Sequence, residues 1–156
     1  MEKLKAVGRI VFGFVLILGV PIGIFVLAKG SGWAAEHVLP ALFVLGALVL
    51  FLDLFLLVAS VVKPVRLVAG PTLYASSYLF GGILWLSGLV YTYALWGMVG
   101  VLVGFLVLGI GVVPIGMMAT LLHGQWEPFF SLVLLTVITF GFRIAGVALL
   151  ASTGAK

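Results

Sequence analysis

The longest uncharged stretch of the chain runs from Leu67 to Leu122, and no Asp, Glu, Lys, Arg or His interrupts it. As a continuous helix this stretch would rise about 84 Å, whereas one membrane crossing takes about 30 Å. It is therefore long enough for two crossings joined by a turn. A water-soluble fold of this chain length leaves much of its surface exposed and could not cover so much apolar area. We expect most of the chain to lie in lipid.

Composition and charge agree with a membrane protein. Charged residues make up 8% of the chain, against roughly 25% in soluble domains. The net charge of +4 comes from scattered basic residues that flank apolar runs, where they meet lipid headgroups. A nucleic-acid partner is therefore not expected. The chain has no cysteine, which excludes disulfides and thiolate ligands.

Hydropathy predicts an all-α, polytopic membrane protein, a compact bundle of five transmembrane helices in a single domain. The spans are expected at about 7–28, 41–62, 71–92, 98–122 and 128–151. The turn between the third and fourth spans is placed in YTYALWG, residues 91–97, because Tyr and Trp favour the membrane–water interface. A signal peptide is the alternative for the first span, although its apolar run exceeds the usual length. Its removal would leave four helices.

The basic residues also predict the orientation. With a cytoplasmic N-terminus, five of them lie inside: Lys3, Lys5, Arg9, Lys63 and Arg66. Lys29 and Lys156 then lie outside, so the excess inside favours this topology. In size and composition the chain is similar to small bacterial membrane proteins. We therefore expect a multi-pass protein of the cell membrane, specifically the bacterial inner membrane.

Small and polar residues recur at helical spacing in the later spans, which predicts the faces through which the helices pack. These residues are Gly46, Asp53 and Ser60; Tyr74, Ser77, Gly81, Gly88 and Thr92; Gly100, Gly104 and Gly111; and Thr136, Thr139, Arg143 and Gly146. Pro114 follows in GIGVVPIGMM, residues 109–118, and is expected to kink the fourth span. The kink is either static or a hinge.

Asp53 and Arg143 are the two charged residues well inside the predicted spans. An isolated charge at the bilayer centre costs about 2.5–3.5 kcal/mol on insertion scales. Asp53 is therefore expected to face protein or water, or to be protonated. A pair with Arg143, direct or through water, is one solution, and the alternative is that Arg143 extends toward the membrane surface. Such a pair would either fix the helix faces or relay a proton or ion.

The polar break HGQWE separates the last two predicted spans and contains His123 and Glu127. On a continuous helix these two residues would share a face, but Gly124 and Pro128 interrupt that helix. Two ligands are also too few for a metal site. An interfacial turn is the first interpretation, and a gate or proton entry is the second.

Three functions remain open. The first is a channel or transporter for an ion, a proton or a small solute that uses Asp53 and Arg143 together with nearby hydroxyls, namely Thr136, Thr139, Tyr74 and Ser77. The second is a non-catalytic structural or regulatory subunit, and the third is an intramembrane enzyme that acts on lipid. No catalytic constellation, cofactor motif or metal motif is recognised, so no enzyme activity and no cofactor are expected. Five short helices enclose little volume, so a homo-oligomer or a larger membrane complex is expected.

Overall fold

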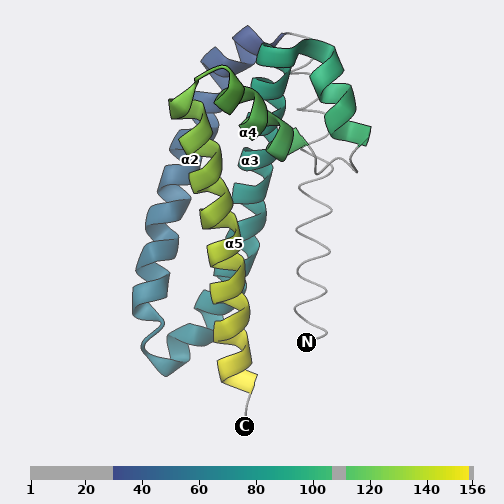
Figure 1. The fold of residues 1–156 in the computed structure, drawn as a ribbon. Coiled ribbons are helices and arrows are strands. Elements are labelled where there is room, and N and C mark those ends of the chain that lie inside the picture. Colours follow the sequence, from purple (N-terminus) through teal and green to yellow (C-terminus); the bar gives the residue numbers. More distant parts are fainter. Residues whose placement is uncertain (1–29, 107–111, 155–156) are drawn as a thin grey trace.

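The computed structural model describes residues 30–106 and 112–154, and this part of the chain is entirely helical. Its helices are α2 (Ser31–Ala59), α3 (Lys63–Leu106), α4 (Val112–Leu122) and α5 (Trp126–Gly154) (Figure 1). The helices α2, α3 and α5 are long and apolar enough to cross a membrane. The all-helical class is thereby confirmed for the described residues. The first predicted span, 7–28, lies outside them.

The predicted turn in residues 91–97 is found at its last residue. Gly97 has φ 63° and ψ −157°, a backbone conformation open almost only to glycine, and it separates the long part of α3 from its final turns. The sequence thus marked the correct break. Because helical geometry resumes immediately after Gly97, α3 continues to Leu106 in a new direction (Figure 1).

The fourth predicted span, 98–122, is not one long helix. Its first residues belong to the end of α3, and α4 contributes only 11 residues, which is about 16 Å of helix, or roughly half of the hydrocarbon core. Pro114 is the third residue of α4, where its missing N–H would have no partner within the helix. Pro114 therefore lies at the start of a helix rather than in its middle.

The HGQWE break ends α4 in a regular helix cap. Gly124 has φ 67°, the Gln125 N–H donates to the Thr120 carbonyl at 2.8 Å, and the Gly124 N–H donates to the Leu121 carbonyl at 3.1 Å. This hydrogen-bond pattern is that of a Schellman motif. The predicted interfacial turn is therefore a tight connection from α4 into α5, which begins at Trp126.

The α2–α3 turn and the end of α5 lie at the same end of the bundle (Figure 1). Five membrane crossings would place them on opposite sides of the membrane. In Figure 1 the turn between α2 and α3 and the end of α5 both lie at the bottom, and the kink of α3 and the start of α5 lie at the top. The chain between Gly97 and Trp126 thus returns to the side from which it departed. Hydropathy alone could not show this, because two short apolar helices and one crossing helix have similar composition.

Glycines let α3 approach its neighbours closely, as their spacing predicted. A Cβ atom on Gly146 of α5 would lie 2.8 Å from the Tyr74 backbone nitrogen. A Cβ atom on Gly116 of α4 would lie 2.9 Å from the Gly88 carbonyl oxygen. Both distances are shorter than any real Cβ contact, so backbones meet at these points. α3 is therefore the central helix against which α4 and α5 are packed.

α2 packs against α3 alone among the described helices, and within these ranges no Cα atom of α2 lies within 8 Å of one in α5. The contact face includes Gly46, whose added Cβ would lie 3.1 Å from Ile83 Cδ1. The outer face is apolar and exposed, with Phe51 at 78% and Phe55 at 66% exposure. Such a helix needs lipid, or another helix, along most of its circumference.

Candidate functional site

Asp53 is completely buried, although the residues beside it on α2 are exposed. It lies on the face of α2 that meets α3, seven residues after Gly46. Because the two helices are antiparallel, the residue opposite Asp53 on α3 lies about seven positions before Ile83, and this residue is Ser76. The carboxyl group of Asp53 therefore faces protein and does not point into lipid.

Neither carboxyl oxygen of Asp53 has a hydrogen-bond partner among the described residues. The Ser76 hydroxyl lies beside the carboxyl group, but its single O–H donates to the Leu73 carbonyl at 3.1 Å. The single Ser76 proton can therefore serve either the Leu73 carbonyl or the Asp53 carboxyl group, but not both. An acceptor-only carboxylate would remain unsatisfied here, which buried polar groups rarely are.

Arg143 does not pair with Asp53. Its guanidinium carbon lies 4.6 Å from the centre of the Tyr78 ring, within the range of a cation–π interaction. The Nε atom of Arg143 is buried and has no hydrogen-bond partner among the described residues. The Tyr78 hydroxyl in turn lies 3.0 Å from the Tyr74 hydroxyl. The predicted direct pair is thus absent, because Arg143 is held by an aromatic ring of α3.

The two charged residues nevertheless lie at the same level of the bundle. Asp53 lies beside Ser76 and Arg143 lies over Tyr78, and these two α3 residues are separated by about 3 Å along the helix axis. Together with Tyr74, whose hydroxyl lies 3.0 Å from that of Tyr78, these four residues form the polar layer of the bundle. α3 stands between the two charges and contacts both.

The predicted hydroxyls serve their own helices. Thr136 donates to the Leu132 carbonyl at 2.8 Å, Thr139 donates to the Leu135 carbonyl at 2.7 Å, and Ser77 donates to the Tyr74 carbonyl at 2.7 Å. The Tyr74 hydroxyl is hydrogen-bonded to that of Tyr78, and the Tyr74 backbone lies against Gly146 of α5. None of these four residues hydrogen-bonds to Asp53.

Two residues of the polar layer, Ser76 and Tyr78, were missed by the sequence interpretation. Both belong to YASSY, residues 74–78. The two tyrosines are four apart and so share a face of the helix. That spacing was the available signal for Tyr78. Nothing in the sequence distinguishes Ser76 from Ser77, because adjacent residues on a helix face different neighbours and the choice depends on packing.

His123 and Glu127 lie far from the polar layer. Both are exposed, and the His123 Nδ1 atom lies 2.9 Å from the Ala119 carbonyl oxygen. Glu127 precedes Arg143 by 16 residues on α5, or about 24 Å along the axis. Any role as a gate would therefore act at the opposite end of the bundle. No group of three or more His, Asp or Glu that could hold a metal occurs in the described part.

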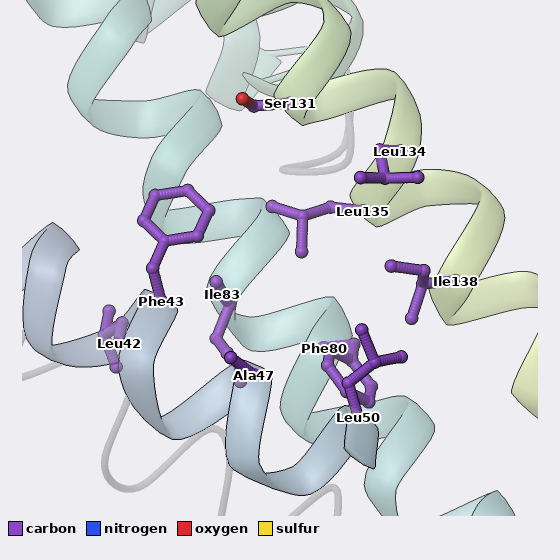
Figure 2. Close-up of a pocket in the computed structure, with 11 residues that line it drawn as sticks. Leu42, Phe43, Ala47, Leu50, Phe80, Ile83, Ser131, Leu134, Leu135 and Ile138 are labelled. Atoms are coloured by element: carbon purple, nitrogen blue, oxygen red, sulfur yellow. The ribbon is translucent and has the colours of Figure 1, made fainter. Parts of the chain in front are cut away.

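A pocket of about 250 Å³ separates α2 from α5 above the polar layer. Figure 2 shows its walls: Phe43, Ala47 and Leu50 come from α2, Phe80 and Ile83 from α3, and Leu134, Leu135 and Ile138 from α5. Ser131 supplies a hydroxyl, which donates to the Glu127 carbonyl at 3.0 Å. The pocket is smaller than the usual 300–1,000 Å³ of small-molecule sites and almost wholly apolar. It suits hydrocarbon better than a polar solute.

Comparison with known proteins gives no family assignment. No family model matches the chain, and no curated protein and no solved structure matches it.

Proposed function

We propose that this protein is a multi-pass membrane channel or transporter for a small ion, in which Asp53 is the ion-binding group. The observation that carries the proposal is the complete burial of a carboxyl group whose two oxygens have no hydrogen-bond partner in residues 30–106 and 112–154. Inside a membrane such a group is costly, and ionisable residues there usually mark an ion pathway. A purely structural role is a weaker explanation, since Asp53 makes no bond that would hold α2 to α3.

The pocket is too small and too apolar to hold a larger polar solute, so we propose a small ion that binds at Asp53 and not in the pocket. Arg143 lies at the level of Asp53 and supplies a positive charge that would compensate the carboxylate when the ion leaves. We propose further that the α2–α3 turn, with Lys63 and Arg66, faces the cytoplasm, since basic residues accumulate on that side. A membrane crossing by residues 7–28 and a cytoplasmic N-terminus are part of the same proposal, which with α2, α3 and α5 gives four crossings and leaves α4 as a fifth helix that does not cross.

Flux measurements in proteoliposomes test this function. We expect wild-type protein to conduct an ion along its gradient, and Asp53→Asn and Arg143→Gln to abolish the flux while they remain folded. Glu36→Gln is the matched control, because it also removes one carboxylate but at an exposed position near the start of α2. Equal flux in Asp53→Asn and wild type would contradict the proposal.

The runner-up function is a structural or regulatory subunit of a homo-oligomer or a larger membrane complex. The pocket between α2 and α5 favours it, because side chains of a neighbouring apolar helix would fill the gap that α2 and α5 leave. Ala47→Trp would fill the pocket from within. Under this function the variant loses assembly, measured as mass in detergent, and the wild-type protein shows no flux under any ion gradient.

A further inference from the structure

The carboxyl group of Asp53 is buried and has neither a hydrogen-bond partner nor a counter-ion among the described residues. The one hydroxyl beside it, that of Ser76, has a single proton, which is within reach of the Leu73 carbonyl at 3.1 Å as well as of Asp53. The Asp53 oxygens receive nothing from the described residues, and Arg143 is occupied by Tyr78. A protonated carboxyl group suits this environment, since its O–H can donate to a free lone pair on Ser76. A carboxylate suits it less well, because its two oxygens can only accept and would share at most the one Ser76 proton.

A metal cation would need more oxygen atoms than the site provides. Hard cations that have lost their water take six or more oxygen ligands. Beside Asp53 the described chain offers one hydroxyl, that of Ser76, and no cluster of acidic residues. The neighbouring stretches of α2 and α3 are regular helices, so their backbone carbonyls are used within the helices.

No titratable or charged group in the described ranges serves as a counter-ion for the Asp53 carboxyl group. Of the helices that the structure describes, α2 packs only against α3, whose nearby titratable residues are Tyr74 and Tyr78, with their hydroxyls 3.0 Å apart. Arg66, at the start of α3, donates its Nε–H to the Ser60 carbonyl at 2.8 Å. Arg143, from α5, lies over Tyr78. None of these groups hydrogen-bonds to the Asp53 carboxyl group.

We infer that Asp53 is a proton-binding site, occupied at neutral pH, and that the ion handled by this protein is the proton and not a metal cation. The inference rests on the proposed function, in which the protein moves a small ion, and it specifies which ion that is. Binding forms one O–H bond on a carboxyl oxygen, and release returns that proton to water, with no other reactant. The positive charge of Arg143, at the same level on the other side of α3, then compensates the carboxylate without a direct bond.

Infrared spectroscopy of the protein in lipid tests the inference directly, because the carbonyl stretch of a carboxylic acid is separate from carboxylate bands. The probe is the difference spectrum between wild type and Asp53→Asn, which isolates this group from the other acidic residues. We expect an acid band at pH 7 that disappears only when the pH is raised. The band should be equal in sodium, potassium and choline salts.

Two outcomes overturn the proton assignment. One is a carboxylate signal from Asp53 at pH 7, and the other is an acid band that sodium or potassium removes at constant pH. Glu36→Gln is the control and should leave the band unchanged. The proposed function fails separately: an acid band without proton flux in proteoliposomes would leave the proton site standing and remove transport. Sodium flux together with a sodium-sensitive acid band would leave transport standing and remove the proton assignment.

Discussion

Asp53 of α2 and Arg143 of α5 lie at the same level of the bundle on either side of α3, yet they form no ion pair. The reason is that α2 and α5 do not approach each other, and each charged residue is placed by α3. Because a buried ion pair often fails to repay the cost of desolvation, a neutral acid and a ring-stacked guanidinium form a reasonable alternative arrangement.

Asp53→Leu is expected to stabilise the fold. The change removes a buried carboxyl group, of which at least the carbonyl oxygen lacks a donor among the described residues, and introduces a side chain that suits the α2–α3 contact; an unsatisfied buried group costs about 1–3 kcal/mol. The free energy of unfolding in mixed detergent micelles should rise by a similar amount while ion flux is lost. A clear loss of stability would instead mean that the carboxyl group holds α2 in place.

Gly146→Ala should destabilise the contact between α3 and α5 by about 1–3 kcal/mol, the usual cost of overpacking. The added methyl group would meet the Tyr74 nitrogen and the Gly70 carbonyl oxygen, and backbone atoms cannot move aside as a flexible side chain can. Detergent unfolding again measures the change. Gly141→Ala, on the same helix, is the matched control because nothing lies within 4 Å of its added Cβ. It should be neutral or stabilising by about 0.5–1 kcal/mol.

Gly97→Ala tests the kink of α3. The space around Gly97 is open, so the cost comes from the backbone alone, at φ 63° and ψ −157°. Strain of this kind costs about 1–3 kcal/mol. The variant should unfold more easily than Gly141→Ala, which replaces a glycine in ordinary helical geometry. Equal stability of the two variants would show that α3 does not need this conformation.

The sequence predicted the helices better than their connections. Hydropathy placed α2, α3 and α5, and the spacing of Gly46, Gly88 and Gly146 marked their contact faces, because both signals are local to one helix. The sequence did not predict that the chain after Gly97 forms the short end of α3 and the short helix α4, since the direction of a chain leaving a glycine is set by packing. For the same reason the sequence left two alternatives for Arg143, a pair with Asp53 or an extension toward the membrane surface, and could not show a third. The aromatic partner Tyr78 became visible only in three dimensions.

A pair of double-mutant cycles distinguishes these two partners of Arg143. The cycle of Arg143→Gln with Tyr78→Leu should give a coupling of about 0.5–2 kcal/mol, the range of cation–π interactions. The cycle of Arg143→Gln with Asp53→Asn should be additive within about 0.5 kcal/mol, as for residues without contact.

Tyr78→Phe provides the control for the first cycle. It keeps the ring under the guanidinium and removes only the hydroxyl, which lies 3.0 Å from that of Tyr74. Its coupling to Arg143→Gln should therefore be small. A large coupling between Asp53 and Arg143 at neutral pH would mean that the two residues pair in the membrane. Asp53 would then be a carboxylate, and the proton assignment would fail with it.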